Sequence, residues 1–140
     1  MRVIAFRGKR KDTGEWVYGD LLQTINGVMG KEACILPFEI AMTKDVIPET
    51  IGQFTGLLDC NGKRIYEGDI VTYTFIGKGY RQRKERKITY TGKVIFNNSD
   101  SGWAVENTAG KYLDIHIMAI QGWEVIGNIH DNPELLKEAE

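Results

Sequence analysis

The stretch Asp69-Ile70-Val71-Thr72-Tyr73-Thr74-Phe75 decides the fold class of this chain. It is a dense run of β-branched and aromatic residues, which pack well on a pleated surface and therefore predict a strand. Runs of the same kind lie before and after it, among them Trp16–Leu22, Ala33–Leu36 and Trp123–Ile129. Turn residues separate these runs at short intervals, which is typical of antiparallel sheets. We therefore predict a mainly β protein with about nine strands.

Asparagine–glycine pairs mark two of the turns. Asn26-Gly27 and Asn61-Gly62 are strong hairpin signals, because both residues tolerate the positive φ that a type I′ turn requires. Downstream, Lys87–Tyr90 and Lys93–Phe96 predict one long strand that is interrupted near Gly92. At the end of the chain, Asn132-Pro133-Glu134 has the chemistry of a helix start and predicts a short C-terminal helix.

The strands of the C-terminal half suggest a small closed sheet. The entry Gly68-Asp69-Ile70-Val71 suits an SH3-like barrel, and we expect such a barrel between about Gly62 and His130. A boundary near Asn61 would separate an N-terminal β region, residues 1–61, from the barrel and helix of residues 62–140. The sequence fits either one core or two.

Composition and charge exclude several classes of protein. The chain has 140 residues, 42% apolar and 26% charged, which is the balance of a globular domain. Its apolar runs are far shorter than the ~20 residues of a membrane span, and Met1–Arg10 lacks the apolar core of a signal peptide. We expect a soluble cytoplasmic protein. In that compartment Cys34 and Cys60 would be reduced, buried thiols.

The most distinctive local feature is basic. From Lys78 to Lys93 there are seven basic residues and one acidic residue, a local charge of +6 in a chain of net charge −1. Tyr73, Phe75 and Tyr90 flank the stretch. Basic side chains next to aromatic ones can neutralise phosphates and stack bases. The stretch therefore predicts a nucleic-acid site made of Lys78, Tyr80, Arg81, Arg83, Lys84, Arg86 and Lys87.

Two other interpretations of the basic stretch remain open. Lysine and arginine also protect exposed strand edges from pairing with other chains. In addition, the tail from Glu124 to Glu140 holds five acidic residues and one lysine, so a basic hairpin could meet an acidic tail within or between chains.

No group of residues has the spacing of a known chemistry. Glu67 and Asp69 are interpreted as turn residues that bond local backbone N–H groups. His116 and His130 have no cysteine or carboxylate at metal-ligand spacing, so we predict neither metal nor cofactor. Trp16, Trp103 and Trp123 are expected to fill the core. The residues favour a non-enzymatic role over an enzyme whose site is assembled from distant positions.

Two long segments carry a family resemblance. One runs from Ile47-Pro48-Glu49-Thr50-Ile51-Gly52 through Asn61-Gly62-Lys63 to Gly68-Asp69-Ile70-Val71, and the other from Glu124 to Leu136. Both resemble the YopX family of phage and prophage proteins, as does the opening Phe6-Arg7-Gly8-Lys9. The resemblance spans residues 1–140 as a single YopX-like unit, although Phe75–Gly92 matches no family pattern.

The resemblance implies an origin and a fold, and it offers no catalytic residue to carry over. We therefore expect a phage accessory protein that acts through protein–protein contacts as a homo-oligomer, with a protein partner that the sequence does not identify. The alternatives are an accessory factor that binds nucleic acid through residues 78–93, and an enzyme.

Overall fold

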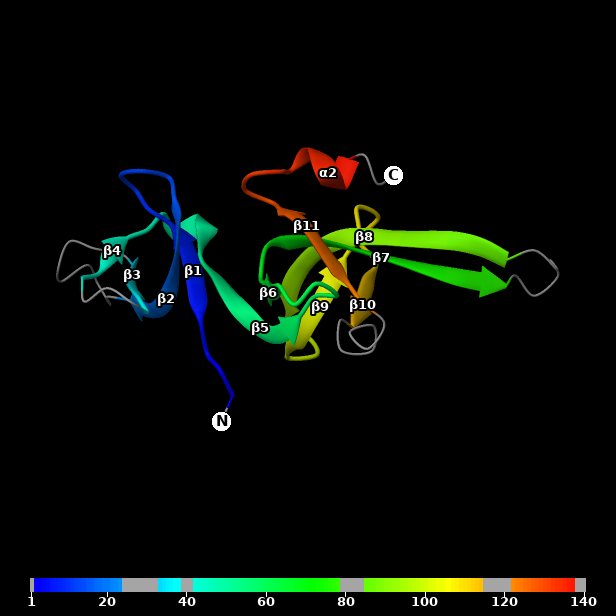
Figure 1. Ribbon diagram of the computed structural model, residues 1–140, viewed down its shortest axis with the longest axis horizontal. Coiled ribbons are helices and arrows are strands. Elements are labelled where there is room, and N and C mark those ends of the chain that lie inside the picture. Colours follow the sequence, from blue (N-terminus) through cyan, green and yellow to red (C-terminus); the bar gives the residue numbers. More distant parts are fainter. Residues whose placement is uncertain (1, 24–32, 39–41, 79–84, 115–121, 138–140) are drawn as a thin grey trace. The chain divides into compact units, whose positions relative to one another are not determined.

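The computed structural model describes residues 2–23, 33–38, 42–78, 85–114 and 122–137. The chain forms two compact units, residues 1–56 and 57–140, which we call the first and second units (Figure 1). Both are mainly β, all strand pairs given below are antiparallel, and one short α-helix lies near the C-terminus. Within the described residues, no helix is long and apolar enough to cross a membrane.

The first unit is a sheet with strand order β4-β3-β2-β1-β5, and the short strand β6 (Arg64–Tyr66), which follows β5 in the chain, belongs to the second unit. Its strands are β1 (Phe6–Lys9), β2 (Trp16–Gln23), β3 (Ala33–Pro37), β4 (Lys44–Asp45) and β5 (Gly52–Leu58). The predicted hairpin across Asn26-Gly27 is confirmed in its strands, because Gln23 pairs with Ala33. The turn itself lies outside the described residues. The short helix η2 (Pro48–Thr50) precedes β5.

The first unit has its own apolar core. Ala33, Ile35 and Val46 are buried, and the partly buried Phe6, Val17, Leu21 and Ile51 pack around them. Trp16 was expected in the core, and that expectation was wrong. It lies on β2 next to the core residue Val17, and alternation along a strand puts the two side chains on opposite faces.

The second unit is a sheet with strand order β10-β9-β8-β7-β11. Its strands are β7 (Asp69–Lys78), β8 (Glu85–Asn97), β9 (Gly102–Glu106), β10 (Tyr112–Asp114) and β11 (Glu124–Asn128). The SH3-like barrel expected here is not confirmed, because the described strands form a sheet that does not close. β11 pairs with β7 at one edge, and β10 pairs with β9 at the other.

Trp123 is the centre of the second core. It is 1% exposed and is surrounded by buried side chains from the sheet and from β6: Ile65, Val71, Tyr73, Val94 and Val105. The partly buried Leu57, Tyr90, Trp103, Leu113 and Val125 complete the cluster. The predicted core role of Trp123 and Trp103 is therefore confirmed.

Two glycines of the second sheet have clear physical roles. The predicted interruption near Gly92 was wrong, because β8 continues through it. A Cβ at Gly92 would lie 2.5 Å from the carbonyl oxygen of Glu106, so the close approach of β9 requires glycine there. Between Val125 and Gly127 the pairing of β11 with β7 shifts register, which marks a β-bulge.

The C-terminal helix α2 (Glu134–Lys137) confirms the predicted helix start. The side chain of Leu135 in this helix packs close to the backbone of Gly127. A Cβ added at Gly127 would lie 2.9 Å from the Cδ1 atom of Leu135. The side chain of Asn132 accepts a hydrogen bond from the backbone N–H of Asn128 at 3.3 Å. This bond connects the end of β11 to the start of the helix.

Candidate nucleic-acid interface

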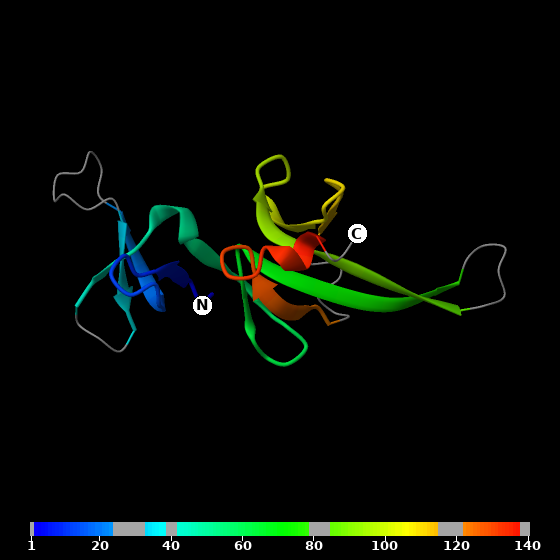
Figure 2. The same cartoon turned by 90° about the horizontal axis from the view of Figure 1, so that it is seen from above.

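The hairpin of β7 and β8 extends beyond the strands beside it. β11 pairs with β7 only from Asp69 to Thr72, and β9 pairs with β8 only from Lys93 to Asn97. Farther out, the register runs from Tyr73 opposite Tyr90 to Lys78 opposite Glu85. We call Tyr73–Lys78 and Glu85–Tyr90 the arm. Figures 1 and 2 show it standing out from the other strands of the second unit.

The base of the arm is fixed on the core. The rings of Tyr73 and Tyr90 lie 5.6 Å and 6.0 Å from the ring of Trp123, and the Tyr90 hydroxyl donates to the carbonyl oxygen of Lys111 at 2.8 Å. Burial raises the pKa of Tyr90, and this outweighs the lowering by a hydrogen bond from the Asn107 N–H. The hydroxyl therefore stays protonated and donates throughout the neutral pH range.

One face of the hairpin is a row of hydroxyl and ammonium groups. The hydroxyls of Thr72 and Thr91 are 3.0 Å apart, and those of Thr74 and Thr89 are 3.1 Å apart. Side chains alternate along a strand, so the threonines of β8 share their face with Lys87 and Lys93. Lys87 is exposed, and the Lys93 ammonium lies 3.9 Å from Glu106. Such groups can donate hydrogen bonds to phosphate oxygens.

The sequence analysis did not predict this row of hydroxyl and ammonium groups. The signal was present in the sequence, because threonine alternates with other residues at positions 72 and 74 and again at positions 89 and 91. Alternation places those threonines on one face only if the two strands pair in the observed register. The threonines were instead counted only as strand formers.

The structure places part of the predicted basic site. Lys78 ends β7, Arg86 lies near the start of β8 opposite Gly77, and Lys87 lies opposite Ile76. The remaining predicted residues lie outside the described part of the chain: Tyr80, Arg81, Arg83 and Lys84. The assignment of all seven residues to a nucleic-acid site stays a prediction.

The paired carboxylates Glu67 and Asp69 do not form an open site. Asp69 is 2% exposed and its Oδ2 accepts a hydrogen bond from the backbone N–H of Tyr66 at 2.8 Å, as the turn interpretation expects. Gly68, at φ +90°, makes this turn possible. Within the described ranges, no group of three histidine, cysteine or acidic residues could hold a metal ion.

Of the histidines and cysteines, the structure describes His130, Cys34 and Cys60. The backbone N–H of His130 donates to the side chain of Asn128 at 3.0 Å, while His116 lies outside the described residues. Cys34 is buried as predicted. The prediction of a buried thiol at Cys60 was wrong, because this residue is exposed in the turn before β6.

Comparison with known proteins agrees with the resemblance in the sequence. Residues 5–137 match the YopX protein family. No curated protein matches the chain. Protein EF1440 from Enterococcus faecalis, known from a crystal structure, is similar in fold with a TM-score of 0.56 and 23% identity. The match covers 97% of this chain and 99% of EF1440. Because the family match extends over nearly the whole sequence, the chain belongs to the YopX family.

Proposed function

We propose that this protein is a non-enzymatic phage accessory protein that binds double-stranded DNA with its arm. One observation carries the proposal. The described arm is a two-stranded ribbon beyond Thr72 and Thr91, and the basic stretch of the sequence continues from its end. Lys87 of the arm is exposed, so a polyanion can reach its charge.

The dimensions of a two-stranded ribbon support a duplex as the ligand. Neighbouring strands are about 4.8 Å apart, and Tyr73–Lys78 reaches about 20 Å at ~3.3 Å per residue. The major groove of B-form DNA, ~12 Å wide, admits such a ribbon. The major groove of an RNA helix is too narrow for protein side chains to read. The threonine and lysine row could then contact phosphates at the groove edge.

Neutralising basic residues of the arm and of the sequence that joins its two strands tests the proposal. We call the resulting protein the arm-neutralised variant. In the variant Arg81→Gln, Arg83→Gln, Lys84→Gln, Arg86→Gln, Lys87→Gln, we expect binding of a short labelled DNA duplex to weaken at least about tenfold at low salt. The slope of affinity against salt concentration should also become shallower, because fewer counterions are released. Fluorescence anisotropy across a salt series measures both quantities.

A matched control distinguishes the effect of losing these particular basic residues from the effect of lowering the net charge. Five exposed basic residues elsewhere can be changed to glutamine together, which alters the net charge equally: Lys11, Lys63, Arg64, Lys111 and Lys137. We expect this control to bind DNA nearly as the unmodified protein does. Equal losses in both variants, or no DNA binding by the unmodified protein at low salt, would contradict the proposed function.

An aromatic patch favours a second candidate, a homo-oligomer or another protein contact. Phe96 is 42% exposed and its ring makes an edge-to-face contact with Trp103 at 5.2 Å. Trp103 and Tyr112 line a neighbouring hollow of about 330 Å³. Aromatic residues are enriched in protein interfaces. Like DNA binding, this role would place the protein in the cytoplasm of a bacterial host.

Self-association tests the second candidate. Sedimentation equilibrium at micromolar concentrations should detect a dimer or larger oligomer, and Phe96→Ser should weaken it at least about tenfold. Ile126→Ser is a suitable control, because Ile126 is similarly exposed at 40% and belongs to β11. A monomer at every concentration would exclude the homo-oligomer.

A further inference from the structure

A groove in the first unit has the lining of a ligand site. It measures about 440 Å³, and Arg10, Glu15, Trp16, Tyr18, Phe38 and Lys44 are among the residues that line it. The volume lies within the ~300–1,000 Å³ of typical small-ligand pockets. The turn between β1 and β2 and the start of the turn after β3 contribute to it. In antiparallel strands these two turns lie at the same end of the sheet.

Three aromatic rings form much of the groove. Trp16 and Tyr18 are two residues apart on β2, so their side chains lie on one face of the strand. Phe38 follows Pro37, which pairs with Gly19 and so places Phe38 beside Tyr18. Tyr18 is 43% exposed and Phe38 is 57% exposed, although large aromatic side chains are costly to leave in water. Their exposed ring surface can stack against a planar ligand.

Two cationic side chains lie beside the Trp16 ring, and a third lines the groove. The Arg7 guanidinium lies 4.6 Å from the centre of the Trp16 ring, and the Lys9 ammonium lies 5.5 Å from it. Lys44 lines the groove beside the rings. These charges oppose a cationic ligand such as a methylated lysine, for which an aromatic cage would otherwise be suited. They favour a ligand that is both planar and anionic.

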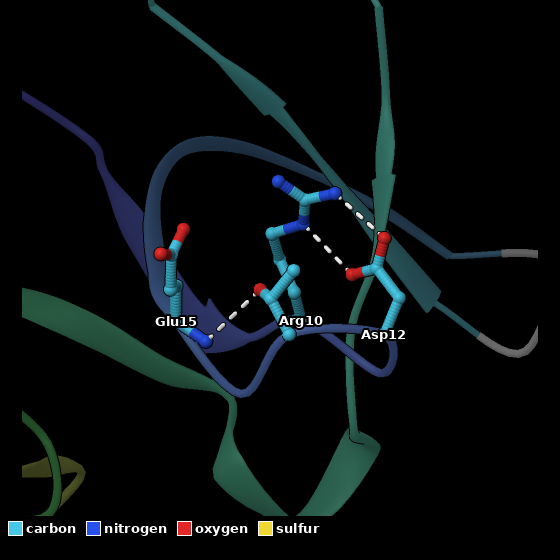
Figure 3. Close-up of polar contacts among 4 residues, drawn as sticks. Arg10, Asp12 and Glu15 are labelled. Atoms are coloured by element: carbon cyan, nitrogen blue, oxygen red, sulfur yellow. Dashed lines mark hydrogen bonds and ion pairs between the residues drawn. The ribbon is translucent and has the colours of Figure 1, made fainter.

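The charge of Arg10 is already compensated. Its guanidinium donates hydrogen bonds to both carboxylate oxygens of Asp12, at 2.9 Å and 2.7 Å (Figure 3). This hydrogen-bonded pair raises the pKa of Arg10 and lowers the pKa of Asp12. Arg10 and Asp12 thus neutralise one another, and Lys44 is the cation that lines the groove beside the aromatic rings.

We propose that this groove binds a base of single-stranded nucleic acid. The base stacks on Tyr18 and Phe38, and Lys44 contacts the adjacent phosphate. Single-strand binding proteins combine the same two elements, aromatic platforms for the bases and cations for the backbone. The site is independent of the arm, because all of its residues belong to the first unit.

The test uses the arm-neutralised variant, so that the arm adds nothing to the binding. Labelled oligothymidylate is compared with an abasic oligomer of equal length, which carries the phosphates without bases. We expect Tyr18→Ala and Phe38→Ala each to weaken oligothymidylate binding about tenfold, the loss of one stacked base. Leu58→Ala, which shortens an apolar side chain that is 55% exposed in the second unit, should change nothing. Lys44→Gln should reduce the salt dependence.

Two outcomes would overturn the proposal. One is equal binding of the abasic oligomer and oligothymidylate. The other is oligothymidylate binding that neither Tyr18→Ala nor Phe38→Ala weakens. Saturable binding of a proline-rich peptide that both substitutions abolish, without oligothymidylate binding, would assign the groove to a polyproline helix instead. Duplex binding by the unmodified protein reports on the arm separately, so the two proposals fail independently.

Discussion

Trp123→Ala should lower the free energy of unfolding of the second unit by about 3–5 kcal/mol, the range for deleting a large aromatic side chain from a core. Trp123 is 1% exposed and contacts the rings of Tyr73 and Tyr90, so its loss leaves a cavity beneath the base of the arm. A loss of this size is comparable to the entire stability of many domains. Urea unfolding followed by circular dichroism measures it.

Two further variants establish the cause of this loss. Trp123→Phe should recover much of the stability, because it keeps most of the ring volume. The indole Nε1 has no hydrogen-bond partner among the described atoms, so the phenylalanine variant gives up no such bond there. Tyr112→Ala, at an exposed position, should change the free energy of unfolding by less than about 0.5 kcal/mol. A loss below about 1 kcal/mol for Trp123→Ala would mean that the ring does not organise this core.

Asp59→Ala should destabilise the second unit by about 2–4 kcal/mol, because it leaves three backbone donors without their acceptor. Asp59 is 7% exposed. Its Oδ1 accepts from the N–H groups of Asn61 at 2.9 Å and Lys63 at 2.8 Å, and its Oδ2 accepts from Val125 at 3.1 Å. One carboxylate therefore connects the Asn61-Gly62 turn to β11.

The same carboxylate should make stability depend on pH. Burial acts to raise the pKa of Asp59, but hydrogen bonds from Val125, Lys63 and Asn61 lower it below its ordinary value. The ionised form is thus favoured by folding. Its contribution is complete above the pKa of the unfolded chain, ~3.9, and disappears as the pH falls through the lower pKa of the folded chain.

A pH series of urea unfolding curves tests this dependence. The stability difference between the unmodified protein and Asp59→Asn should be constant near neutral pH and shrink below about pH 4. Asp100→Asn is the matched control, because Asp100 is exposed and accepts only a 3.2 Å hydrogen bond from Asn97 among the contacts described. A difference that persists unchanged at low pH would show that the charge of Asp59 is not what stabilises the turn.

Local patterns predicted most of the strands. β-branched and aromatic runs located β7 and β8, and Asn61-Gly62 marked a turn in which Gly62 has φ +82°. These features depend on residues close together in the chain, so the sequence displays them directly. The acidic turn residue Asp69 was interpreted correctly for the same reason.

Contacts between residues far apart in the chain were harder to predict from the sequence. The open sheet of the second unit depends on the pairing of β11 with one edge of β7, and the local sequence of neither strand predicts this pairing. The role of Gly92 is set by the Glu106 backbone across the sheet. The bond from Asp59 to Val125 likewise joins residues that are remote in sequence.

The two candidate sites likewise differ in how far the sequence predicts them. The basic stretch was visible in the sequence because its charges are consecutive. The groove beside Tyr18 was not visible, because its aromatic and charged residues come from separate strands and turns. Trp16 was assigned to the core on its size alone, but it is only half-buried and lies beside the cations Arg7 and Lys9.

The self-paired arm has a consequence for how the length of this protein can vary. Beyond Thr72 and Thr91 the two strands have only each other as described partners, so residues can be added there without disturbing the core. Adding two residues to each strand would lengthen the ribbon by about 7 Å and keep each side chain on its original face. Adding one to each strand would instead turn every outer side chain to the opposite face. Natural variation in this hairpin should therefore occur in steps of two residues per strand.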